Sequence, residues 1–228
     1  MSTTMSVKEN IESILSEMPQ GVSLVAVSKF HPSEAIMEAY MAGQRLFGES
    51  RVQELLKKIP ELPEDIKWHF IGHLQTNKLR QIIGKTAMIE SVDSERLLEM
   101  IDKESEKAGV VTNVLMQIHV AEEETKFGFS PEELEEYFVN RRFENLKSTH
   151  ICGVMGMATN TDDTERVADD FRRIASIFKK IKEEIAPDLR GFDTLSMGMS
   201  GDWKIAVKEG SNLVRVGSAI FGQRDYSK

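Results

Sequence analysis

Lys29 is the first residue whose type and position indicate chemistry. It follows the segment LVAVS (residues 24–28), an apolar run typical of a strand that is covered on both faces. An ammonium group inside such a strand would cost several kcal/mol unless it were paired or neutral. Apolar surroundings lower the pKa of a lysine, and the neutral amine forms a Schiff base with a carbonyl group. Lys29 therefore either marks the exit of the strand into water or is held there for carbonyl chemistry.

Two glycine-rich segments near the C-terminus have the composition of phosphate-binding turns. The segment SMGMSGDW (residues 196–203) offers small residues, the Ser200 hydroxyl and a helix start at Gly201 or Asp202. The segment RVGSAIFG (residues 215–222) offers Gly217 and the Ser218 hydroxyl. Backbone N–H groups at such turns and at helix N-termini bind phosphate dianions. Either segment alone is equally well an ordinary turn, but the two together favour a phosphate site.

A ligand with both an aldehyde and a phosphate would satisfy Lys29 and these two segments, and pyridoxal 5′-phosphate is such a molecule. Its ring nitrogen needs a partner. Arg215 stands two residues before Gly217, so strand alternation puts both on one face. An arginine there would keep the ring nitrogen unprotonated and weaken the electron sink that most pyridoxal chemistry uses. The alternative for Arg215 is an ion pair inside the protein with Glu49 or Asp202.

These residues lie at the ends of predicted strands, at residues 23–29, 45–50, 67–73, 87–93, 112–120, 150–158, 194–200 and 213–222. Amphipathic stretches with helix start and stop signals separate the strands, most clearly at residues 32–43, 130–139 and 161–188. Eight strands alternating with helices predict a parallel sheet closed into a single (β/α)8 TIM barrel, with an open doubly wound sheet as the alternative. In such a barrel the active face lies at the carboxyl ends of the strands.

Composition narrows the class of protein. The 228 residues carry no linker-like tract and predict one domain over residues 1–228. A formal charge of −8 argues against a nucleic-acid partner. Cys152 is the only cysteine, which excludes an intrachain disulfide, fits a reducing cytosol and, in mid-strand, predicts an inert buried thiol. No apolar stretch approaches the ~18–20 residues that cross a bilayer, and the N-terminus lacks signal-peptide order. We expect a cytoplasmic protein without membrane contact.

Histidines and methionines near the strand ends allow weaker predictions. His69 and His73 share one strand face but lie roughly 13 Å apart along the chain, too far for one metal ion, and no third ligand is evident. Methionines alternate along the sixth and seventh predicted strands and should fill core gaps, with one or two touching a bound ring; they are Met155, Met157, Met197 and Met199. The acidic run within residues 119–129 predicts a solvated loop.

Six segments occur in order between Val22 and Arg224: AVSKFHP, LFGESRVQE, WHFIGHLQTNK, ICGVMGMAT, LSMGMSGDWKIAV and GSNLVRVGSAIFGQR. Together they resemble the pyridoxal-phosphate homeostasis protein family, relatives of the alanine racemase N-terminal barrel. The resemblance implies that pyridoxal phosphate forms a Schiff base with Lys29 and that Arg215 faces the pyridine nitrogen. It implies phosphate contacts at Ser200, Gly217 and Ser218, and further cofactor contacts at Ser50, His73, Met157, Ser196 and Met199. Members of this family are thought to buffer or deliver the cofactor.

The chain departs from the usual family pattern after the second predicted strand. The family generally reads Gly-Glu-Asn-Tyr there, whereas this chain has Ser50 and Arg51 in the last two positions. Ser50 is shorter than the asparagine and would reach the cofactor only through water. Ser218 keeps a hydroxyl where the family often has threonine. Asn212 replaces another common threonine.

A racemase needs a second acid/base side chain in addition to the lysine, whereas a protein that only carries the cofactor does not. Enzymes similar to alanine racemase need a tyrosine from a C-terminal β domain of the partner subunit, and this chain ends six residues after Gly222. Tyr40 and Tyr137 fall on predicted outer helices, and Tyr226 is in the tail. We therefore expect a monomer without catalytic residues that holds pyridoxal phosphate and serves apo forms of pyridoxal-phosphate enzymes. The alternatives are a weak amino acid racemase or a Schiff-base aldolase, although aldolase lysines commonly lie on strand six.

Overall fold

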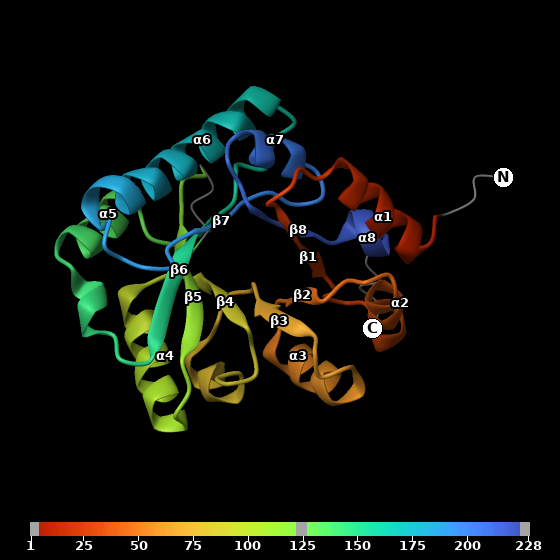
Figure 1. The fold of residues 1–228 in the computed structure, drawn as a ribbon, viewed down its shortest axis with the longest axis horizontal. Helices are drawn as coiled ribbons and strands as arrows, with labels where there is room; N and C mark the ends of the chain where they lie inside the picture. Colours follow the sequence, from red (N-terminus) through yellow and green to blue (C-terminus); the bar gives the residue numbers. More distant parts are fainter. Residues whose placement is uncertain (1–4, 122–126, 224–228) are drawn as a thin grey trace.

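The chain folds into a closed parallel barrel surrounded by helices (Figure 1). The computed structural model describes residues 5–121 and 127–223. Within them, eight strands pair in sequence order and the last pairs with the first. The strands are β1 (Ser23–Val27), β2 (Leu46–Glu49), β3 (Lys67–Phe70), β4 (Met88–Val92), β5 (Thr112–Ile118), β6 (Thr149–Gly156), β7 (Thr194–Ser196) and β8 (Leu213–Val216). The predicted barrel is confirmed, and the open doubly wound sheet is wrong.

Helices connect successive strands on the outside of the barrel (Figure 1). The α-helices are α1 (Val7–Glu17), α2 (Ser33–Met41), α3 (Val52–Lys58), α4 (Glu95–Ala108), α5 (Pro131–Val139), α6 (Thr164–Lys180), α7 (Trp203–Lys208) and α8 (Ser218–Phe221). Shorter turns of helix are η1 (Ile59–Glu61), η2 (Thr76–Gln81), η3 (Arg142–Asn145) and η4 (Ile181–Ile185). Of these helices, as far as the chain is described, none is long and apolar enough to span a bilayer.

Local sequence explains where several helices begin. Ser130 caps α5 through a reciprocal pair of hydrogen bonds with Glu133, and Pro131 occupies the first helical position. Asp163 caps α6 by accepting from the backbone of Glu165 and Arg166. Capping side chains satisfy backbone N–H groups that have no partner within the helix.

Apolar residues form two cores. The larger one lies between the strands and the helices, and its largest fully buried side chains include Phe47, Phe70, Phe138, Phe171 and Phe192. The smaller one lies inside the barrel and consists of Val25, Leu115, Cys152, Met155 and Leu213. The predicted burial of Cys152 is confirmed, and burial raises the pKa of its thiol; its inertness stays a prediction.

Polar side chains form the next layer of the barrel interior towards the carboxyl ends of the strands. On β8, Arg215 follows Leu213 by two positions, and on β4, Glu90 follows Met88 in the same way. Side chains two residues apart on a strand lie on the same face. The barrel therefore has an apolar layer with charged groups above it.

Two sequence predictions concern residues outside the described ranges. The acidic run at residues 119–129 falls largely on residues 122–126, and Tyr226 falls within residues 224–228.

Candidate functional site

Lys29 lies in a turn directly after β1, half-buried at the carboxyl end of the barrel. The turn is closed by the His31 N–H, which donates to the Ser28 carbonyl at 3.1 Å. Before the turn, the Val27 carbonyl lies 3.1 Å from the position that a Cβ at Gly217 would take. After it, the His31 ring stacks on Phe221 with ring centroids 5.1 Å apart. The Lys29 turn is thus bracketed by contacts with Gly217 and α8, which together form the β8–α8 segment.

That segment also meets the loop after β7. The Gly217 and Ala219 N–H groups both donate to Ser200 Oγ, at 3.1 and 3.4 Å. Two backbone donors and a hydroxyl that converge in this way form a donor set suited to an anion. The structure therefore brings Ser200 and Gly217 together. Ser218 and Met199 are exposed on the same segments.

Asp202 organises the loop that carries Ser200. Its carboxylate accepts from the Met199 N–H at 2.6 Å, and α7 begins at the next residue, Trp203. The helix start predicted at Gly201 or Asp202 is confirmed within a residue.

Arg215 is buried inside the barrel, with 4% of its surface exposed. Its guanidinium donates to the Gly156 carbonyl at 3.2 Å and to the Ser196 hydroxyl. Its carboxylate partner is Glu90 on β4, with 3.7 Å between Nη1 and Oε2. The sequence prediction named Glu49 or Asp202 and missed Glu90, which closure of the barrel brings opposite Arg215; the charge of Asp202 also acts on this guanidinium.

Glu90 is the centre of this interior network. Its Oε1 accepts from His69 Nδ1 at 2.6 Å, and its Oε2 accepts from the Ser196 hydroxyl at 2.7 Å. Burial alone would raise the pKa of Glu90, but the His69 hydrogen bond and the charges of His69 and Arg215 outweigh burial and hold that pKa below its usual value. Burial lowers the pKa of Arg215, although Glu90 and Asp202 oppose this. Glu90 was missed by the sequence analysis; its signal was an acidic residue within the apolar segment AMIESVD.

A second buried network lies beside the Lys29 turn. Glu49, at the end of β2, is fully buried, and its Oε1 accepts from the Ser28 hydroxyl at 2.6 Å and from Lys58 Nζ at 2.7 Å. Lys58 Nζ also donates to Glu54 at 2.6 Å and to the Ser28 carbonyl at 2.9 Å. Burial raises the pKa of Glu49 to about 7, and the charge of Lys58 opposes that rise. Sequence reasoning also missed Lys58 and Glu54, whose signal was their i, i+4 spacing on one helix.

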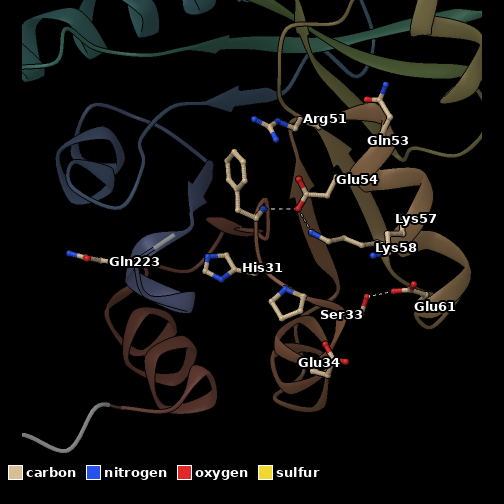
Figure 2. A pocket seen from close by; sticks show the side chains of 12 residues that line it. His31, Ser33, Glu34, Arg51, Gln53, Glu54, Lys57, Lys58, Glu61 and Gln223 are labelled. Carbon is tan, nitrogen blue, oxygen red and sulfur yellow. Dashed lines mark hydrogen bonds and ion pairs between the residues drawn. The ribbon is translucent and has the colours of Figure 1, made fainter. Parts of the chain in front are cut away.

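A groove with a volume of about 680 Å³ opens between α2 and α3 next to this network (Figure 2). Its lining includes His31, Ser33, Arg51, Glu54, Lys57 and Glu61. Phe30, the residue that follows Lys29 in the turn, also lines this groove.

The remaining predicted site residues follow other strands at the same end of the barrel. His73, after β3, lies 3.0 Å from an Asp93 oxygen and stacks on Phe127 with centroids 3.8 Å apart. Ser50, after β2, packs its backbone against Gly72. Met157, after β6, is half-buried. Their contacts with a cofactor stay predictions.

Comparison with known proteins agrees with this geometry. Residues 4–225 match the family model described as alanine racemase, N-terminal domain. The chain is 38% identical to the pyridoxal phosphate homeostasis protein of Schizosaccharomyces pombe, an alignment that covers 100% of this chain and 96% of the relative. It is 39% identical to the protein of the same name from Aquifex aeolicus, with 89% and 87% covered.

Solved structures give the same result. PipY of Synechococcus elongatus without pyridoxal phosphate matches with a TM-score of 0.90 at 36% identity, and PipY with pyridoxal phosphate bound matches with 0.87 at 35%. Both comparisons cover 95% of this chain and 100% of PipY. The family recognised from the sequence motifs is confirmed: the chain belongs to the alanine racemase N-terminal domain family and, within it, to the pyridoxal phosphate homeostasis proteins.

Proposed function

We propose that this protein binds pyridoxal 5′-phosphate through a Schiff base on Lys29 and stores, buffers or delivers the cofactor without turning over a substrate. The observation that carries this proposal is the meeting of the Lys29 turn with the β8–α8 segment, whose N–H groups converge on Ser200. An amine and an anion-binding donor set thus lie at one end of one barrel. The names of the relatives and the PipY complex support the same ligand.

The residues present fit each part of this cofactor. The Gly217 and Ala219 N–H groups and the hydroxyls of Ser200 and Ser218 would hold the phosphate. The guanidinium of Arg215 can only donate hydrogen bonds, so it suits a pyridine nitrogen that is unprotonated and accepts. When bound, the cofactor supplies an aldehyde for the Lys29 amine and an electron sink, which this arginine leaves weak.

The positions of Tyr40 and Tyr137, the tyrosines within the described residues, support storage over racemisation. Tyr40 donates to Asp65 at 2.8 Å, and Asp65 precedes β3, so this pair lies at the end of the barrel opposite Lys29. Tyr137 lies on α5, where burial raises the pKa of its hydroxyl. Neither is placed to move a proton on a ligand at Lys29. We expect a cytoplasmic monomer, with apo forms of pyridoxal-phosphate enzymes as its partners.

The visible spectrum of the purified protein with pyridoxal phosphate tests this proposal. We expect a Schiff-base absorbance band that Lys29→Ala abolishes, and borohydride reduction should attach the cofactor to Lys29. Lys67→Ala, which changes an exposed lysine at the opposite end of the barrel, should keep the band. Persistence of the band in Lys29→Ala would refute the binding mode, and robust racemisation of amino acids by the wild type would refute storage without turnover.

A further inference from the structure

The turn that carries Lys29 has an unusual backbone. Phe30, the residue after Lys29, has a φ of 66°, in the left-handed region that a bulky side chain rarely adopts. A conformation of this kind persists when surrounding contacts hold it. The Arg51 guanidinium lies over the Phe30 ring, 4.4 Å from its centroid, and covers the turn from the side of α3.

Three buried or half-buried charged side chains contact Ser28 and Phe30, the residues on either side of Lys29. On the N-terminal side, Glu49 accepts from the Ser28 hydroxyl at 2.6 Å, and Lys58 donates to the Ser28 carbonyl at 2.9 Å. On the C-terminal side, Glu54 accepts from the Phe30 N–H at 2.6 Å. Lys58 joins the two halves because its ammonium contacts both carboxylates, and Figure 2 shows Lys58 and Glu54 reaching from α3 towards the turn.

Stability alone does not account for this cluster. Lys58 is 5% exposed and Glu49 is fully buried, and Glu49 Oε2 has no hydrogen-bond partner within the described part of the chain. The loss of hydration offsets most of the attraction in a buried ion pair, so apolar side chains of similar size are often as stable or more so. Buried polar networks do specify one geometry among several. The geometry specified here is that of the Lys29 turn.

We propose that Glu49, Glu54 and Lys58, here called the Lys58 clamp, are positioning residues that direct the Lys29 amine at the aldehyde of the ligand. Lys58 and Glu54 hold the peptide groups before and after Lys29, and Glu49 supports them through the Ser28 hydroxyl and the Lys58 ammonium. This inference rests on the proposed function. The clamp touches Ser28 and Phe30, whereas the donors proposed for the phosphate belong to the loops after β7 and β8. Loss of the clamp should therefore weaken Schiff-base formation and leave phosphate binding intact.

Two pairs of variants on α3 test the clamp. Lys58→Met removes the joining ammonium, with Lys57→Met, an exposed neighbour, as its control. Glu54→Ala removes the acceptor of the Phe30 N–H, with the exposed Gln53→Ala as its control. Lys58→Met leaves the carboxylates of Glu49 and Glu54 without their ammonium partner, and an unpaired buried charge is destabilising. The double variant Lys58→Met/Glu49→Gln removes the charge of Glu49 as well and so reduces this destabilisation. Circular dichroism and urea unfolding establish which variants are folded.

Binding of two ligands distinguishes a misplaced Lys29 amine from general damage to the binding site. Pyridoxal 5′-phosphate can form the Schiff base, whereas pyridoxine 5′-phosphate has the same ring and phosphate but no aldehyde. In the clamp variants we expect the Kd for pyridoxal phosphate to rise about tenfold or more and the Kd for pyridoxine phosphate to stay within about twofold. The two controls should resemble the wild type with both ligands. Equal losses for both ligands, or no loss for either, would overturn the proposal.

A measurement on the protein without pyridoxal phosphate tests the clamp independently of the proposed function. Reductive methylation with formaldehyde and a cyanoborohydride reductant, followed by mass spectrometry, gives the rate of methylation at Lys29 relative to that at Lys67 in the same molecule. Folded clamp variants should change this ratio at least about threefold, and the controls should not. A wild type without a Schiff base would refute the proposed function only. An unchanged ratio in every folded clamp variant would refute the clamp, whatever ligand the protein binds.

Discussion

Glu90 and Arg215 bring opposite charges into the interior of the barrel, where neither is more than 4% exposed. Removing one partner of such a pair leaves an uncompensated buried charge, which costs about 3–5 kcal/mol. We therefore expect Glu90→Gln to lower the free energy of unfolding by about that amount in urea titrations. The control is Glu95→Gln, which breaks the partly exposed pair with Arg142 and should cost less than about 1 kcal/mol. A Glu90→Gln protein as stable as this control would show that the pair carries no such role.

Single residues of the site were predictable from sequence to different degrees. Lys29, Ser200 and Gly217 could be proposed as site residues because each stands where an apolar run stops and a polar or glycine-rich segment starts, and the structure places them at one end of the barrel. Glu90 and Lys58 were not predicted from the sequence because their roles depend on partners on other strands and helices. The Glu90 network joins β3, β4, β7 and β8, and the chain shows no local sign of that pairing before the barrel closes. Asn212, for which the sequence suggested no consequence, accepts from the Leu195 N–H at 2.8 Å and donates to the Asp193 carbonyl at 2.7 Å.

The loops at the carboxyl end of the barrel pack closely against one another, and this packing helps to hold the strands and helices in place. The loops after β2 and β3 touch through backbone, because a Cβ at Gly72 would lie 2.2 Å from the Ser50 carbonyl oxygen. Gly72→Ala must therefore push these loops apart, and we expect a loss of about 1–3 kcal/mol in unfolding free energy, measured in urea. Gly201→Ala is the matched control, since a Cβ there meets no atom within 4 Å, and it should change stability by less than about 0.5 kcal/mol. Equal stability of the two variants would contradict the close approach.

Element types were more predictable than element ends. Periodicity and capping residues indicated the strand and helix alternation, yet the predicted strand at residues 213–222 stops at Val216 and its second half forms α8. The segment SAIF has strand-like side chains, but tertiary contacts decide its structure. Asn10 of α1 donates to the Ile220 carbonyl at the end of α8, at 2.8 Å, and α1 itself was not among the predicted elements. The contact joins residues far apart in the sequence, so propensity alone does not reveal it.

The whole molecule carries most of its charge on the surface, where single ion pairs add little to stability. Among the buried carboxylates of the described residues, Glu90 and Glu49 have shifted pKa values, and they act on the pH dependence of stability in opposite directions. The pKa of Glu90 is held below its usual value, so its stabilising contribution is present above the unfolded-state pKa and is lost as the pH falls through its folded-state pKa. Glu49 has a raised pKa, so its stabilising contribution is present below the unfolded-state pKa and is lost as the pH rises through its folded-state pKa.

For Glu49, the pKa is about 7 in the folded protein against a usual value of 4.5, because burial opposes the charged form more than Lys58 and Ser28 support it. Between these values the folded chain holds a proton that the unfolded chain has released. Stability from this group is therefore complete below pH 4.5 and declines as the pH rises towards 7. The repulsion from Glu54 acts in the same direction.

Glu49→Gln removes this titration while keeping the shape of the side chain, so its unfolding free energy should lack that decline. We expect the wild type to lose about 2 kcal/mol relative to Glu49→Gln between about pH 5 and pH 8, measured by urea unfolding at constant ionic strength. Glu95→Gln, which alters a half-buried carboxylate in an outer ion pair, should follow the wild type across the same range. A constant difference between the wild type and Glu49→Gln would mean that Glu49 is ionised throughout, with Lys58 compensating its burial in full.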